Sequence, residues 1–195
     1  MRESKKEEVT ARPEGRVFLS GFGEKKLPDL GAHIIFWSLA VGGLAADLLT
    51  KKLVFDFLSQ RPDFRFSVIK GFISLVMATN KGAAFGMFEG ARVILTVISF
   101  IALLIVLFVF FFAGDKNRLF YVVPGLFAAG ISGNLFDRLF NSGEVRDFIE
   151  VIYWPGLKPW PAFNVADSLL CIAVGVVLIM SFIRRPSGRR AQQHK

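Results

Sequence analysis

The stretch that decides the fold runs from Gly130 to Asp167 and reads GISGNLFDRLFNSGEVRDFIEVIYWPGLKPWPAFNVAD. It leaves one apolar segment, crosses a short polar connection and enters a second apolar segment. Asp137 and Asp167 lie inside or at the mouth of these apolar segments, and Asp147 lies between them. A carboxylate at the edge of an apolar run is costly, so it marks a candidate functional site. We expect Asp147 and Asp167 to converge as a catalytic pair at a membrane surface.

The composition of the chain indicates a membrane protein with a single domain. Apolar residues make up 53% of the 195 residues, and 22 of them are phenylalanine. The formal net charge of +8 would also suit a nucleic-acid-binding protein. The basic residues flank the apolar runs, however, where membrane orientation and anionic lipid headgroups explain them better. We therefore expect membrane lipids as partners, and no nucleic acid.

Cysteine and histidine are too scarce to suggest a disulfide framework or a metal site. The single cysteine, Cys171, excludes a disulfide within the chain, and its place in an apolar run predicts a buried, unreactive thiol. The two histidines, His33 and His194, have no plausible nucleophile beside them. The sequence therefore predicts a protein that uses neither a metal nor another cofactor.

Four apolar runs are long enough to cross a membrane, which takes about 20 residues. They cover Gly31 to about Phe55 and residues 91–113, 119–136 and 168–183. The predicted fold class is an all-α membrane protein with four transmembrane helices. In the first run, Asp47 and Lys51 are four residues apart and share a helix face. They are either a snorkelling ion pair that ends the helix or a pair that supports a site.

The parts outside the four runs divide the chain into three regions. We expect residues 1–30 to form a charged, flexible tail, residues 31–183 the four-helix domain, and residues 184–195 a basic tail. Between the first two spans, residues 64–68 and 72–79 have strand-like patterns, and Lys70-Gly71 suits the turn between them. A small β-rich region is therefore expected there, on the extracytoplasmic side.

The third span carries two patterns of its own. Gly125, Ala129 and Gly133 recur every fourth residue, which favours close helix packing. Asn134, Asp137 and Arg138 fall on one face at the end of the helix, and we expect Arg138 to hold Asp137 as an ion pair.

The distribution of lysine and arginine predicts the orientation. Fourteen of the 24 lie in the two tails and in the short connection 114–118, at high density. The remaining ten are spread over the two longer connections and the residues that border them. This asymmetry predicts that both termini are cytoplasmic and that the candidate site lies near the outer face.

The residues around Asp167 favour acid–base chemistry. Asn164 is a plausible helix N-cap, which places Asp167 in the first helical turn, where the helix dipole favours a carboxylate. A second carboxylate nearby opposes ionisation of both, so the two share one proton. Such a pair can activate water and polarise a carbonyl, which is amide hydrolysis without a metal. The alternative is that Asp147 is a loop acid and Asp167 only a helix cap.

The motifs together resemble the lipoprotein signal peptidases, the signal peptidase II family, over about residues 31–183. The matching blocks are DLLTK at 47–51, NKGAAF at 80–85, GNLFDR at 133–138, VRDF at 145–148 and FNVAD at 163–167. Leu48 departs from the pattern, because the family often has glutamine there, and the charged N-terminal tail is longer than usual.

This resemblance implies an aspartic endopeptidase of the bacterial inner membrane, with Asp147 and Asp167 as its catalytic pair. It implies cleavage of diacylglyceryl-modified prolipoproteins on the N-terminal side of the lipidated cysteine, by a chain we expect to be a monomer. An ion-coupled transporter and a non-catalytic subunit of a membrane complex are the alternatives; the lack of an evident inverted repeat argues against the first. The site-supporting or substrate-binding positions implied are Asp47, Lys51, Asn80, Gly82, Asn134, Asp137, Arg138 and Asn164.

Overall fold

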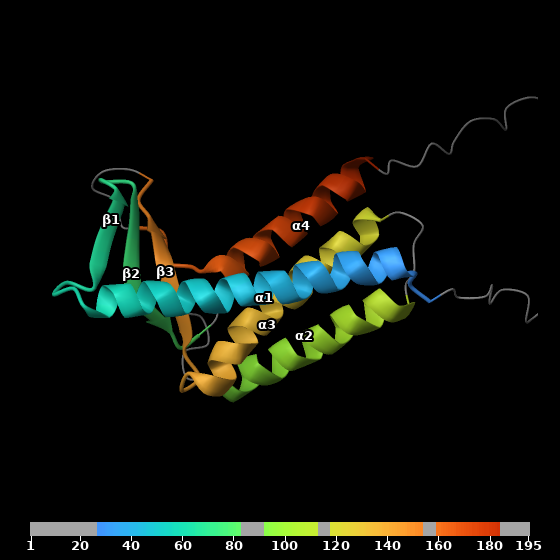
Figure 1. Ribbon diagram of the computed structural model, residues 1–195, viewed down its shortest axis with the longest axis horizontal. Helices are drawn as coiled ribbons and strands as arrows, with labels where there is room; N and C mark the ends of the chain where they lie inside the picture. The colour runs from blue at the N-terminus through green and yellow to red at the C-terminus, as the bar shows by residue number, and fades with distance from the viewer. Residues whose placement is uncertain (1–26, 83–91, 113–117, 154–158, 184–195) are drawn as a thin grey trace, which may run out of the picture.

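Four long helices form the body of the protein (Figure 1). The structure is a computed structural model, and it describes residues 27–82, 92–112, 118–153 and 159–183. All four helices are long and apolar enough to cross a membrane, which confirms the predicted spans. They are α1 (Leu30–Ser59), α2 (Arg92–Phe112), α3 (Leu119–Phe140) and α4 (Val165–Ile183).

A three-stranded antiparallel sheet lies at one end of the helices. Strands β1 (Arg65–Ile69) and β2 (Ile73–Asn80) confirm the predicted hairpin, and Gly71 supplies the positive φ of 76° in its turn. The third strand, β3 (Val145–Val151), comes from the connection between α3 and α4 and pairs with β2. The sheet therefore joins two connections, whereas the sequence predicted strands only between the first two spans.

Helix α3 is the centre of the bundle, because it packs against each of the other three helices. Its small residues allow this close approach, as the recurring Gly125, Ala129 and Gly133 predicted. A Cβ atom at Gly125 would lie 3.1 Å from the Phe36 carbonyl oxygen of α1. A Cβ at Gly130 would lie 2.7 Å from the Ala166 carbonyl oxygen of α4. The helix backbones thus meet where side chains are smallest.

Helix α1 is longer than the other three and continues past their ends to lie against the sheet (Figure 1). It begins at an N-cap, where the Ala32 N–H donates to Asp29 Oδ1 at 2.7 Å. It continues to Ser59, about four residues beyond the predicted end near Phe55. The polar residues Asp47 and Lys51 therefore lie inside the helix and do not end it.

Cys171 lies on the exposed surface of α4, so the prediction of a buried thiol is wrong. The faces of α4 that pack into the bundle carry Ala166 and Ala173, both completely buried. A helix that is apolar all round gives no sequence signal for which side faces the bundle and which faces lipid. That choice is made by the packing of α4 against α3.

Candidate active site

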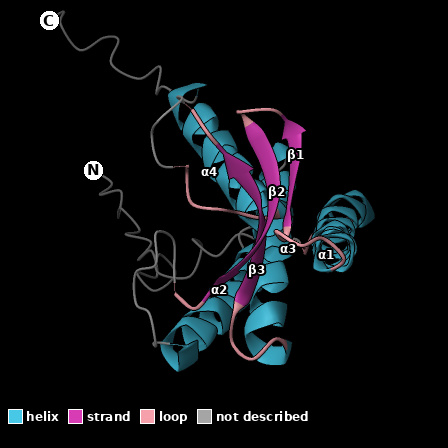
Figure 2. Cartoon of the chain, turned by 90° about the vertical axis from the view of Figure 1, so that its left-hand side faces the viewer, coloured by secondary structure: helices cyan, strands magenta, loops and turns pink. Residues whose placement is uncertain are grey.

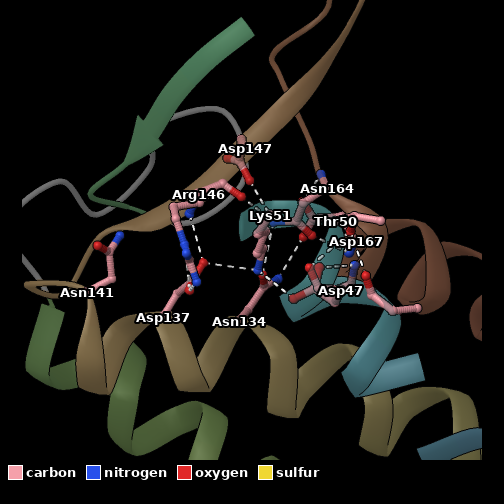
Figure 3. A network of polar contacts seen from close by, with 12 residues as sticks. Asp47, Thr50, Lys51, Asn134, Asp137, Asn141, Arg146, Asp147, Asn164 and Asp167 are labelled. Atoms are coloured by element: carbon pink, nitrogen blue, oxygen red, sulfur yellow. Dashed lines mark hydrogen bonds and ion pairs between the residues drawn. The ribbon is translucent and has the colours of Figure 1, made fainter. Parts of the chain in front are cut away.

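A buried polar cluster lies where the sheet meets the interior of α1, the end of α3 and the start of α4 (Figure 3). Six of its side chains are less than 10% exposed, which is unusual for charged and amide groups at the end of an apolar bundle. The structure brings these predicted site residues together from three different elements and the segment before α4. The six are Asp47, Lys51, Asn134, Asp137, Asp147 and Asn164.

Lys51 is the cation at the centre of the cluster. Its ammonium nitrogen lies 2.7 Å from Asp47 Oδ2 and 3.1 Å from Asp137 Oδ2. It also donates a hydrogen bond of 3.2 Å to Asn134 Oδ1, so an amide oxygen lies beside the ammonium together with the two carboxylates. Lys51 and Asp47 are both fully buried, which excludes a snorkelling pair. Their other interpretation, a pair that supports a site, stays a prediction.

Asp137 is paired with Arg146 and Lys51, so the predicted ion pair between Asp137 and Arg138 is wrong. The Arg146 guanidinium donates to Asp137 Oδ1 from Nη2 at 2.6 Å and from Nε at 3.1 Å, and its main-chain N–H donates to Oδ2 at 2.9 Å. Arg138 instead reaches α2, where Nη1 lies 3.5 Å from Ser99 Oγ. The sequence suggested Arg138 because it is adjacent to Asp137, but the guanidinium of Arg146 on β3 is better placed.

Asn164 and Asn134 connect the two candidate catalytic acids (Figure 3). The Asn164 side-chain amide donates to Asp147 Oδ1 at 2.7 Å and to Asn134 Oδ1 at 3.1 Å. Asn134 Nδ2 in turn donates to Asp167 Oδ1 at 2.8 Å. The two carboxyl groups are therefore held by one hydrogen-bonded chain that crosses from β3 to α3 and α4.

The start of α4 has the capping geometry that the sequence predicted. The Asp167 N–H donates to Asn164 Oδ1 at 2.9 Å, and Asp167 Oδ2 accepts a bond of 3.2 Å from the Asn164 N–H. These reciprocal bonds form a capping box with aspartate in the third helical position. One residue earlier, the Ala166 N–H donates to Asp47 Oδ1 at 2.9 Å, which fixes α1 against the first turn of α4.

Asn80 and Gly82 lie at the end of β2, beside the cluster. The Gly82 N–H donates to Asn80 Oδ1 at 2.9 Å and closes a tight turn. The register pairs Ala78 with Asp147 and Asn80 with Val145, and the Asn80 side chain forms a hydrogen bond to Asp147. The remaining residues of this motif, 83–85, lie outside the described residues.

The surroundings of Asp147 favour its protonated form. Burial of the carboxyl, reinforced by the negative charge of Asp167, raises the pKa of Asp147 to about 7. Hydrogen bonds from Asn164 and Asn80 and the charge of Lys51 oppose this rise only in part. Near neutral pH, Asp147 is therefore poised between its two protonation states.

This environment predicts a carboxyl that titrates near pH 7. The infrared C=O band of the protonated Asp147 carboxyl can be identified by its absence in Asp147→Asn. In the wild-type protein this band should disappear as the pH rises, with a midpoint near pH 7. Asp167→Asn should lower that midpoint, because it removes the neighbouring negative charge. In the unfolded chain the Asp147 carboxyl has its ordinary pKa of 3.8. The folded state therefore binds more protons than the unfolded state between about pH 4 and 7. The stability of the wild type relative to Asp147→Asn should therefore fall as the pH rises through this window. A midpoint near 4 would contradict the prediction.

The family model described as signal peptidase (SPase) II matches residues 39–183. The chain belongs to the signal peptidase II family. The matched region spans all four helices and the sheet, and it includes every residue of the polar cluster. Membership of this family makes the protein a membrane peptidase, with prolipoprotein signal peptides as the family's substrates.

Individual relatives agree with this assignment. A lipoprotein signal peptidase of Chlorobium luteolum is 38% identical over 160 residues, covering 77% of this chain and 92% of that protein. One from Geobacter sulfurreducens is 36% identical over 163 residues, covering 80% and 96%. Among solved structures, a bacterial membrane enzyme at 2.3 Å resolution aligns with a TM-score of 0.69 and 29% identity, covering 89% of this chain and all of that one.

Proposed function

We propose that this chain is an intramembrane aspartic endopeptidase that cuts diacylglyceryl-modified prolipoproteins on the N-terminal side of the lipidated cysteine. Asp147 and Asp167 are its catalytic residues. The observation that carries this proposal is the hydrogen-bonded chain through Asn164 and Asn134 that ends on these two carboxyl groups. The raised pKa of Asp147, in which the charge of Asp167 takes part, supports the sharing of one proton between them.

The two acids take different roles because their surroundings differ. Asp167 accepts hydrogen bonds from Asn134 and from the Asn164 main chain at the N-terminus of α4. Asp147 is buried on β3 and holds the proton. Asp167 is therefore the general base that removes a proton from water, and Asp147 is the acid that donates to the scissile carbonyl.

The reaction then balances without another reactant. The water oxygen bonds to the carbonyl carbon while its proton passes to Asp167, and Asp147 stabilises the developing oxyanion by its hydrogen bond. Collapse of the tetrahedral intermediate breaks the C–N bond, and the departing amine takes the proton held by Asp167. The products are the free signal peptide and a new N-terminal cysteine.

The other predicted site residues position this pair. Lys51, with Asp47 and Asp137, ties α1 to α3, and the Asp47 bond to Ala166 fixes the first turn of α4. Asn80 and Gly82 shape the end of β2 beside Asp147. Arg138 is half-buried and within electrostatic range of Asp137, Asp147 and Asp167, and its charge is available to a substrate carbonyl.

The cleavage assay gives the direct test of this function. The purified full-length chain should shorten a diacylglyceryl prolipoprotein by its signal peptide, as seen by gel shift and mass spectrometry, and should leave the unmodified precursor uncut. Cleavage should persist with EDTA and in Cys171→Ala, because the mechanism uses neither a metal nor a thiol. Activity that is lost with EDTA and restored by zinc would overturn the aspartic mechanism.

The proposed location is the bacterial inner membrane, with both tails cytoplasmic, the site near the outer face, and the chain acting as a monomer. The polar cluster and the sheet lie at the same end of the helices, as this orientation requires. In a Cys171→Ala background, a membrane-impermeant thiol reagent applied to intact spheroplasts should label Gln60→Cys and should not label a cysteine at position 10. Labelling of position 10 alone would reverse the topology.

A further inference from the structure

A cluster of exposed side chains, which we call the sheet tip, lies at the hairpin end of the sheet. The side chains of Ile69, Phe72, Tyr153 and Trp160 are 50%, 45%, 67% and 45% exposed. Lys70, in the turn between β1 and β2, is exposed beside them. This is a large share of apolar and aromatic surface for one end of a three-stranded sheet, and such a patch marks an interaction surface.

The sheet tip is built from two connections that are joined by hydrogen bonds. The Ile152 N–H donates to the Phe72 carbonyl oxygen at 2.8 Å, and the Trp160 N–H donates to the Val151 carbonyl oxygen at 2.9 Å. The rings of Tyr153 and Trp160 meet edge to face with their centroids 5.9 Å apart. The exposed side chains are therefore held on a paired backbone.

The position of the sheet keeps the tip close to the end of the helices. The strands run across the long direction of the bundle, and the hairpin end lies on the side of α4 (Figures 1 and 2). A sheet that ran along the helices would carry its hairpin away from the bundle. Here the strands extend sideways, so the tip stays near the end of the helices, whereas the segment that leads from α1 to β1 projects farthest from the bundle (Figure 1).

The chemistry of the sheet tip matches the boundary between lipid headgroups and acyl chains. Tryptophan and tyrosine are enriched at that boundary because each ring combines an apolar body with a polar group. Ile69 and Phe72 can bury apolar surface among the upper acyl chains, and the Lys70 ammonium can remain among the phosphates. The apolar surface of the four spans is already in lipid, so the bilayer is the partner that this patch meets first.

We propose that the sheet tip inserts into the lipid interface at the sheet end of the bundle, as a membrane contact additional to the four spans. One consequence rests on the proposed function. Strand β3 carries Asp147 near its beginning and leads directly to the tip through Ile152 and Tyr153. Insertion of the tip would hold both ends of β3 at fixed depths and so position Asp147 relative to the scissile bond.

Depth-dependent fluorescence quenching tests this contact in the full-length chain. The three tryptophans are Trp37, Trp154 and Trp160, and changing all three to phenylalanine gives a silent background. Phe72→Trp is added to that background, and the protein is reconstituted in phosphatidylcholine–phosphatidylglycerol vesicles with or without brominated acyl chains. The expected result is a strong loss of emission, greatest for bromine placed near the carbonyl end of the chain.

The matched control is Phe64→Trp in the same background. Phe64 is 51% exposed but lies before β1, at the end of the sheet opposite the tip. Emission from position 64 should remain nearly unquenched. Unquenched emission from position 72 would overturn the proposal, whether its spectrum indicates water or burial against a second copy of the chain. Equal quenching at both positions would also overturn it, because the tip would then be no deeper than the rest of the sheet.

Discussion

Asp147→Asn and Asp167→Asn are each expected to abolish cleavage of the diacylglyceryl prolipoprotein while the protein still folds. Asparagine keeps nearly the shape of aspartate but cannot take a proton from water or donate one to a carbonyl oxygen. Loss of general acid–base catalysis typically costs 10²–10⁴-fold in rate, so each variant should fall to the limit of a gel-shift assay. At position 167, asparagine can still cap α4, which protects the helix start.

The two losses should not add. In the proposed mechanism the carboxyl groups act as one unit through a shared proton, so removing either one should disable the same step. The double variant is therefore expected to be about as inactive as either single variant. A double variant that loses the product of the two single losses would show that the acids act in independent steps.

Glu150→Gln is the matched control for these substitutions. Glu150 lies three residues after Asp147 on the same strand, and its carboxylate pairs with Arg65 rather than with the cluster. The same carboxylate-to-amide change should therefore leave turnover near that of the wild type. Near-normal turnover in Asp147→Asn or Asp167→Asn would mean that the catalytic acids have been wrongly chosen.

Lys51→Met is expected to cause the largest loss of stability. The ammonium of Lys51 neutralises Asp47 and Asp137, and all three side chains are fully buried. Methionine fills a similar volume but leaves Asp47 without a cation and Asp137 with Arg146 alone. Removing one partner of a buried ion pair typically costs about 3–5 kcal/mol, because an unpaired charge remains in a medium of low polarity.

Lys52→Met provides the comparison at the next position of α1. Lys52 pairs with Asp56 at 3.1 Å, but both side chains are more than half exposed, where solvent screens the interaction. In purified protein at neutral pH, thermal unfolding in detergent should show a much lower midpoint for Lys51→Met and little change for Lys52→Met. Equal midpoints for the two variants would show that the buried cluster does not stabilise the fold.

Sequence alone was sufficient for the local elements. Each transmembrane helix is defined by its own apolar length, and the β1–β2 hairpin by alternating residues around a glycine turn, so neither depends on distant contacts. The N-cap of α4 is equally local, because Asn164 and Asp167 are only three residues apart. Asp137 and Asp167 stood out for the same reason, as carboxylates at the edges of apolar runs, whereas Asp147 lies between these runs and was singled out with the VRDF block.

Strand β3 and the partner of Asp137 required the tertiary structure. The segment VRDFIEV mixes three charged residues with apolar ones, and its strand character becomes clear only when it pairs with β2. The sequence suggested the adjacent Arg138 as the partner of Asp137, but neighbouring residues of a helix point in different directions, and β3 brings the Arg146 guanidinium to 2.6 Å. A pairing between a strand and a helix cannot be read from the periodicity of either element.

Two further properties were decided by packing. The exposure of Cys171 depends on which face of α4 meets α3, and a uniformly apolar helix does not specify that face. The pKa of Asp147 near 7 depends on burial of its carboxyl and on the charge of Asp167, twenty residues along the chain. The sequence thus determined which residues could perform the chemistry. The tertiary structure decided which of them meet and which acid is placed to hold the proton, because burial and charge act through space.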